Sequence, residues 1–277
     1  MTEPFVLEKE QTLSLQNWKK HAPNMVVGFT TKNGGVSEGH FNTLNMGLHV
    51  HDKLEAVCKN KEIVAEQLGM PTEKWVGCDQ THEDNIVKVD KSHIGKGVYS
   101  YNSALSGTDG IYTDKSDTLL TLCFADCVPL YFYAPDESFV GIAHAGWKGT
   151  VKNIAGKMIN EWKSQGIDVA SILAAVGPSI SAKAYVVDDH VVNKVKEALP
   201  FVNENLFMKE VSEGQYELDL KRMNYELLLQ AGVKEENILC SSLCTSEEGS
   251  LFFSHRRDEG KTGRMMSYIG LKEEKES

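Results

Sequence analysis

The stretch Leu119–Trp147 reads LLTLCFADCVPLYFYAPDESFVGIAHAGW, and it indicates the fold more clearly than any other part of the chain. It contains three short apolar runs, Leu119–Ala125, Leu130–Ala134 and Phe139–His144, which are bounded by Asp, Pro and Gly residues. Runs of this length with such boundaries predict strands. Because no helical pattern separates the three runs, the strict strand–helix alternation of a Rossmann fold or a TIM barrel is not expected.

The same reading extends in both directions from this stretch. Further strands are predicted at Val26–Thr31, Asn85–Val89, Gly110–Thr113, Ile172–Val176, Tyr216–Leu218, Asn237–Ser241 and Met265–Leu271. Apolar residues three and four apart predict helices at Leu54–Leu68, Thr150–Gln165, Val191–Leu199 and Leu220–Ala231. This order predicts an α+β fold, in which a mixed sheet lies in layers and the helices pack outside.

The composition is that of an ordinary globular domain. The chain has 277 residues, of which 41% are hydrophobic and 25% are charged, and no repeat or composition shift marks a boundary. We therefore expect one domain over residues 1–277, with a frayed tail at residues 272–277. The net charge of −10 disfavours a nucleic-acid partner, which would require a basic stripe, but it allows a small anionic substrate to be held locally.

The sequence predicts neither a membrane partner nor export. The most apolar stretch, Leu119–Ala134, is interrupted by Asp126 and Pro129 and falls short of the ~20 residues that a bilayer requires. The N-terminus has no basic region leading into an apolar run, as a signal peptide would. We expect a cytoplasmic protein, whose six cysteines are thiols or metal ligands rather than disulfides.

Three residues that can bind a transition metal each lie at an edge of a predicted strand. Cys127 lies just past the first strand of the opening stretch, His144 ends the third, and His82 precedes a strand that starts at Asn85. Two imidazoles and one thiolate suit zinc, and three protein ligands leave a fourth position open, as in catalytic zinc sites. The same ligands could hold copper, and each residue alone could be an ordinary core or turn residue.

Three loops carry polar residues that could bind a substrate. Arg256 and Arg257 belong to a loop with three arginines within nine residues, which indicates an anion site, although a solvated loop with Arg–Asp pairs has the same pattern. Lys148 lies in a glycine-bearing turn, and Asn45 and His49 lie in a polar, glycine-bearing stretch. We predict that these five residues rim a pocket beside the metal.

Six short motifs follow one another along nearly the whole chain. They are GGVS (34–37), LNMGLHV (44–50), QTH (80–82), ADCVP (125–129), HAGW (144–147) and RRD (256–258). In this order they resemble the YfiH/YlmD family, also called the laccase-domain or multicopper polyphenol oxidoreductase family. The resemblance implies a layered α/β/β/α mixed-sheet fold of the YfiH type and a metal site formed by His82, Cys127 and His144.

The resemblance also implies an enzyme that acts on purine nucleosides. The implied reactions are deamination of adenosine to inosine, and phosphorolysis of adenosine, inosine, guanosine and S-methyl-5′-thioadenosine to the free base and (methylthio)ribose 1-phosphate. For deamination, water activated by zinc would attack C6, while Asp126 would move protons. For phosphorolysis, Arg256, Arg257 and Lys148 are candidates to hold phosphate. The predicted catalytic residues are His82, Asp126, Cys127 and His144.

Three positions depart from the family pattern. Lys32 replaces the usual arginine and loses its bidentate fork, and Glu83 stands where glycine often follows the histidine. Val186 replaces the customary glutamate after Tyr185, so no catalytic role is assigned to that position.

Three other classes of function remain open. A laccase-like, copper-dependent polyphenol oxidase needs many paired histidines, whereas this chain has nine histidines and one His-x-His, at residues 49–51. A cysteine hydrolase would use Cys127 as a free thiolate, so a metal on Cys127 would contradict it. A non-enzymatic interaction module would show no turnover on any nucleoside. The sequence does not predict an oligomeric state.

Overall fold

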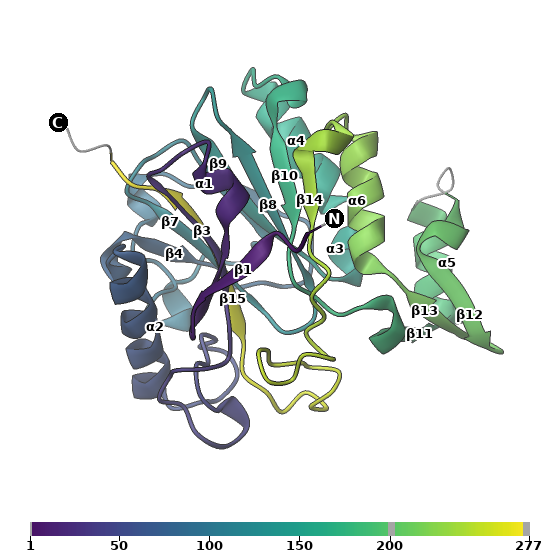
Figure 1. Cartoon of the computed structure of the whole chain (residues 1–277), viewed down its shortest axis with the longest axis horizontal. Coiled ribbons are helices and arrows are strands. Elements are labelled where there is room, and N and C mark those ends of the chain that lie inside the picture. The colour runs from purple at the N-terminus through teal and green to yellow at the C-terminus, as the bar shows by residue number, and fades with distance from the viewer. Residues whose placement is uncertain (1, 199–202, 274–277) are drawn as a thin grey trace.

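The computed structural model describes residues 2–198 and 203–273. Two six-stranded mixed sheets form its centre, and the helices lie outside them (Figure 1). The strand order is β1-β2-β3-β15-β7-β4 in the first sheet and β14-β10-β8-β9-β6-β5 in the second. A small third sheet, β11-β13-β12, lies with α5 at the right of the view.

The elements have the following bounds. The first sheet contains β1 (Phe5–Lys9), β2 (Thr12–Leu15), β3 (Met25–Thr30), β4 (Trp75–Gly77), β7 (Leu119–Phe124) and β15 (Met265–Leu271). The second contains β5 (Ile86–Lys88), β6 (Gly110–Thr113), β8 (Val128–Ala134), β9 (Phe139–Ala145), β10 (Leu173–Val176) and β14 (Ile238–Cys240). The third contains β11 (Val186–Asp188), β12 (Met208–Ser212) and β13 (Gln215–Leu218). The helices are α1 (Gln16–Lys19), α2 (Leu54–Leu68), α3 (Trp147–Val151), α4 (Ile154–Ser164), α5 (Asp189–Ala198) and α6 (Leu220–Gln230).

Three apolar clusters separate the layers. Between the two large sheets, Phe29 and Phe124 of the first pack with Ile142 of the second. On the outer face of the second sheet, α4 buries Trp162, which contacts the ring of Phe132. The helix α2 covers the outer face of the first sheet with a smaller cluster. The predicted layered α/β/β/α arrangement is therefore confirmed, and it rests on apolar area removed from water on both faces of each large sheet.

The ten predicted strands all form, and each end lies within two residues of its predicted position. Five further strands, β1, β2, β4, β11 and β12, were not predicted from the sequence. They have three to five residues each, and β1 and β12 are mostly exposed, so they lack the apolar runs that identify buried strands.

The predicted helix Thr150–Gln165 is wrong in its boundaries. The structure has two helices there, α3 and α4, because Asn153 takes a left-handed backbone conformation with φ of 58°. The side-chain oxygen of Asn153 accepts a hydrogen bond from the Gly156 N–H at 2.9 Å and caps the second helix. Asparagine tolerates this conformation and caps helices well, so the break has a local cause that apolar spacing does not reveal.

Other helix ends follow local chemistry more simply. The helix α2 has the predicted bounds, and it ends because Gly69 adopts φ of 58° and its N–H bonds back to the last turn. The helix predicted at Val191–Leu199 corresponds to α5, and its predicted end at Leu199 lies outside the described residues. No helix in the described part of the chain is both long and apolar enough to span a bilayer.

The predicted frayed tail is partly tied to the fold. The Lys272 N–H donates to the carbonyl of Asn24 at 3.0 Å, and the Glu273 N–H donates to the Asp117 carboxylate at 3.1 Å. Residues 274–277 lie outside the described residues.

Candidate metal centre

The three predicted metal ligands converge. One ligand atom from each of His82, Cys127 and His144 lies within 4.8 Å of the other two. Cys127 lies in the turn that carries the chain from β7 of the first sheet to β8 of the second. His144 lies opposite Pro129 in the β8–β9 pair, so the strand register brings it next to that turn. His82 comes from the loop between β4 and β5.

A buried carboxylate, Asp109, organises two of these ligands. Its Oδ1 lies 2.7 Å from Nδ1 of His144, which leaves Nε2 as the free ring nitrogen. The same carboxylate accepts hydrogen bonds from the backbone N–H groups of His82 and of both its neighbours, at 2.9 to 3.1 Å. A carboxylate behind a histidine fixes the ring and raises its basicity as a ligand. The sequence analysis missed Asp109, whose only signal is a carboxylate at the start of a buried strand.

The electrostatics of the centre favour a thiolate. Burial raises the pKa of the Cys127 thiol, but the imidazoles of His144 and His82 outweigh this effect and bring that pKa down to about 6. Burial lowers the pKa of His144, but Cys127 and Asp109 outweigh it and raise that pKa to about 9. Without a metal, the pair is therefore a thiolate and an imidazolium at neutral pH.

The donor set fits one metal ion. Two ring nitrogens and one thiolate, with a buried carboxylate behind one ring, match the ligands that zinc prefers, and copper accepts the same donors. Within residues 2–198 and 203–273, no second cluster of three or more His, Cys, Asp or Glu side chains has this spacing. The described residues therefore offer one candidate metal centre.

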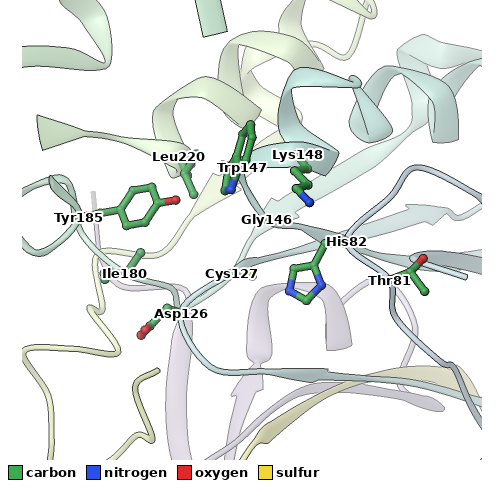
Figure 2. Close-up of a pocket in the computed structure, with 10 residues that line it drawn as sticks. All are labelled: Thr81, His82, Asp126, Cys127, Gly146, Trp147, Lys148, Ile180, Tyr185 and Leu220. Carbon is green, nitrogen blue, oxygen red and sulfur yellow. The ribbon is translucent and has the colours of Figure 1, made fainter. Parts of the chain in front are cut away.

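Two adjoining cavities open onto the centre, and both are lined by His82, Asp126, Cys127, Trp147 and Tyr185. Ile180 also lines both cavities. We call the first cavity, of about 300 Å³, the apolar lobe; Leu220 and Lys148 line the apolar lobe and not the second cavity (Figure 2). We call the second, of about 400 Å³, the cationic lobe; its own lining residues are His49, Gln80, Cys123, Ala125, His144, His255, Arg256 and Arg264.

Three of the five predicted substrate residues line these cavities. His49 and Arg256 line the cationic lobe and Lys148 lines the apolar lobe. Burial, with the nearby charge of Arg264, lowers the pKa of His49 to about 4, so its ring is neutral at pH 7. The sequence analysis missed Arg264 as a site residue, although it belongs to the arginine-rich loop.

The structure does not bring Asn45 or Arg257 to either cavity. Asn45 is buried, and its side-chain oxygen accepts from the N–H groups of Gly47 and Arg264 at 3.0 and 2.9 Å. Arg257 pairs with the carboxylate of Asp258 at 2.7 Å and donates to three backbone carbonyls. Both side chains are therefore used to shape the loops that present other residues.

Asp126 lines both cavities, and its carboxylate is held by three hydrogen bonds. It has a φ of 87° and is 7% exposed, and its carboxylate accepts hydrogen bonds from Thr245 at 2.7 Å and Ser254 at 3.0 Å. A third bond comes from the Arg256 N–H at 2.7 Å. In Figure 2 its carboxylate points away from His82. These contacts hold the arginine loop beside Cys127, and the predicted proton-transfer role of Asp126 stays a prediction.

The three departures from the family pattern lie outside both cavities. Glu83 forms an ion pair with Lys152 at the surface. The carbonyl of Val186 accepts a hydrogen bond from Nη1 of Arg256 at 2.8 Å. The backbone of Lys32 bonds to the Leu251 carbonyl at 2.8 Å.

Comparison with known proteins identifies relatives over the whole fold. A family model described as multi-copper polyphenol oxidoreductase laccase matches residues 26–272. Purine nucleoside phosphorylase YlmD of Bacillus subtilis (strain 168) is 50% identical over 274 residues, which cover 98% of each chain. The crystal structure of YlmD from Geobacillus stearothermophilus is 46% identical with a TM-score of 0.95, and that of the Bacillus licheniformis hypothetical protein YfiH is 50% identical with a TM-score of 0.94. Each match covers 98% of this chain and 100% of the crystallised one.

The fold and the centre define a layered α/β protein with a candidate His-Cys-His metal site beside a two-lobed cavity. The chain belongs to the multi-copper polyphenol oxidoreductase laccase family, the YfiH/YlmD family that its motifs indicated. The resemblance to bacterial YlmD is confirmed at 50% identity. The names of these relatives support nucleoside phosphorylase activity, and hence an enzyme, at the level of the family.

Proposed function

We propose that this protein is a zinc-dependent purine nucleoside phosphorylase. The observation that carries the proposal is that the cationic lobe and the apolar lobe share a wall, and that this wall contains residues of the candidate metal centre. Phosphate is an anion that needs cations, whereas a purine is a flat, largely apolar ring that suits an apolar pocket. The relatives named purine nucleoside phosphorylase support the same conclusion.

The chain's own residues divide the work between the two lobes. Arg256 and Arg264 attract phosphate into the cationic lobe, where the neutral ring of His49 offers a further hydrogen bond. Trp147, Ile180 and Leu220 exclude water from the apolar lobe and take the purine. His82, Cys127 and His144 would hold zinc, which supplies a Lewis acid and an acidified water when it is bound.

The proposed substrates are adenosine, inosine, guanosine and S-methyl-5′-thioadenosine, each cleaved to a base and a ribose 1-phosphate. Deamination of adenosine to inosine is a second proposed activity, favoured by the position of His82 and Cys127 on a wall of both lobes. For this reaction we assign Asp126 a positioning role, since its carboxylate already accepts hydrogen bonds from Thr245, Ser254 and the Arg256 N–H.

The cysteine hydrolase is the strongest competing class, because Cys127, His144 and Asp109 form a chain of thiolate, imidazole and carboxylate. Metal bound to Cys127 separates the two functions. The cytoplasmic location and the single domain over residues 1–277 stay predictions, and purine nucleosides and phosphate are the proposed small-molecule partners.

The test is a product assay on the purified protein with its metal content measured. Inosine should yield hypoxanthine and ribose 1-phosphate only when phosphate is present, while adenosine should also yield inosine without phosphate. Hydrolysis of inosine without phosphate would contradict the phosphorylase, and phenol oxidation with copper in place of nucleoside turnover would favour the oxidase.

A further inference from the structure

Tyr185 stands out among the cavity residues because its main chain is fixed while its hydroxyl is free. Its N–H donates to the Ala182 carbonyl at 3.0 Å, and its own carbonyl accepts from the Leu218 N–H at 3.1 Å, which ties it to β13 of the small sheet. The hydroxyl has no hydrogen-bond partner in the part of the chain that the structure describes. In Figure 2 this hydroxyl points toward Trp147, across the opening above Cys127.

The ring of Tyr185 is held in place by an arginine. The guanidinium of Arg256 lies over the ring, 4.9 Å from its centroid, and Nη1 of the same arginine donates to the Val186 carbonyl at 2.8 Å. The backbone of Arg256 is in turn bonded to Asp126, next to the metal ligand Cys127. A free hydroxyl on a ring that an arginine holds, and whose main chain is fixed, is a preorganised hydrogen-bond donor.

Tyr185 lies where the two lobes meet. It lines both the apolar lobe, with Leu220, and the cationic lobe, with Arg264. With a purine in the first lobe and phosphate in the second, the glycosidic bond that breaks lies at this junction. The purine side is lined by the Lys148 ammonium and by two neutral donors, the indole N–H of Trp147 and the phenol of Tyr185. Of these, the phenol belongs to the ring that Arg256 of the phosphate side holds.

We propose that the Tyr185 hydroxyl donates a hydrogen bond to the purine ring as the ring departs, an inference that rests on the proposed phosphorylase function. The C1′–N9 bond breaks and its electron pair remains on the purine, while a phosphate oxygen forms the new bond to C1′. The proton that hydrogen phosphate loses in this step neutralises the purine, so Tyr185 keeps its own proton throughout.

The surroundings of Tyr185 keep it a donor. Burial and the nearby Cys127 thiolate raise the pKa of the phenol to about 12, so the hydroxyl carries its proton over the whole range in which the enzyme is assayed. The donor therefore acts on the charge that develops on the purine and is not consumed in the reaction.

The experiment compares two leaving groups in the metal-loaded Tyr185→Phe variant. Inosine leaves with negative charge on its purine, whereas 7-methylguanosine carries a positive charge and leaves without developing an anion. Removing one preorganised donor should lower kcat for inosine by about 10- to 100-fold, and that for 7-methylguanosine by less than about threefold. The ratio of the two rates is the decisive readout, because a smaller fraction of folded protein lowers both rates equally.

A matched control removes a phenol of the same small sheet outside the cavities. The hydroxyl of Tyr216 bonds to Asp189, so Tyr216→Phe should leave the ratio of the two rates unchanged. Equal loss on both substrates, or no loss on inosine, in Tyr185→Phe would overturn the assignment of Tyr185 alone. Failure of the wild-type protein to cleave either nucleoside would instead overturn the proposed function, and the assignment with it.

Discussion

The metal centre and the cationic lobe share a wall but are built differently. In the centre, His144 lies on a central strand and is 2% exposed, and the buried Asp109 bonds both its ring and the loop of His82. In the lobe, His49 comes from one loop, and Arg256 and Arg264 both come from the loop between β14 and β15. Backbone N–H groups of these loops donate hydrogen bonds to the side-chain oxygens of Asn45 and Asp126.

This difference teaches which changes should remove the metal and which should spare it. Strand register and one buried carboxylate fix the metal ligands, so a change there disturbs the geometry and the charge balance of the centre. Loop residues can be altered while the strands stay in place, so a change in the lobe should affect substrate and leave the metal bound.

The largest expected effect comes from removing the thiolate. Cys127→Ala should lose the metal and, with it, nucleoside turnover, while the layered core of the two sheets keeps the protein folded. Metal content by elemental analysis and a thermal melt by circular dichroism check this. If Cys127→Ala retains one metal per chain or turns over nucleosides at the wild-type rate, the assignment of metal binding to the centre is wrong.

The next effect is the pH dependence of metal binding. Between pH 6 and 9 the metal-free pair holds Cys127 as thiolate and His144 as imidazolium, so binding must displace the His144 proton. Zinc affinity should therefore rise about tenfold for each pH unit between pH 6 and 9, because one proton is released on binding. Above pH 9 the His144 proton is already lost, so this pair adds no further rise in affinity. Competition with a zinc chelator across this range measures the slope, and a flat profile would contradict the ion pair.

A smaller loss is expected from the carboxylate behind the ligands. Asp109→Asn should weaken zinc affinity by about 10- to 100-fold, because an amide orients the His144 ring less well and cannot accept all the N–H bonds of the His82 loop. Asn85→Ala, near the same loop but outside the cavities, serves as the control. Unchanged affinity in Asp109→Asn would show that the ligands are positioned without the carboxylate.

The two neighbouring arginines give the smallest and most selective pair of effects. Arg256→Ala should raise the KM for phosphate by about tenfold with the metal retained, since it lines the cationic lobe. Arg257→Ala should instead lower the free energy of unfolding by about 1–2 kcal/mol, because it bonds three carbonyls of its own loops. Phosphate kinetics and denaturant unfolding on both variants test this, and a larger phosphate defect in Arg257→Ala would reverse the assignment.

The sequence allowed the fold and the metal ligands to be predicted for the same reason. Apolar runs such as that of β8 identify buried strands, and the ligands lie at the ends of those strands in the order of the family motifs. Short exposed strands such as β12 and the break at Asn153 depend on local pairing and capping, which periodicity does not carry.

The residues of the cavity were predicted less completely, for a physical reason. Arg256 and Arg257 are adjacent and chemically identical, yet only the first faces the cavity, because Asp258 and nearby carbonyls hold the second. Tyr185 contacts Arg256, and Asp109 contacts His144 and the His82 loop, all of them distant in the sequence. Sequence spacing does not report such contacts.

The measurement that tests the account most directly is stepwise reconstitution. Protein stripped with a chelator is titrated with zinc, and phosphate-dependent release of hypoxanthine from inosine is followed at each step. The account predicts that activity rises in proportion to bound zinc, reaches its limit at one zinc per chain, and stays absent in Cys127→Ala. Full phosphorolysis by the stripped protein, or in Cys127→Ala, would contradict the claim that this metal centre serves the nucleoside cavity.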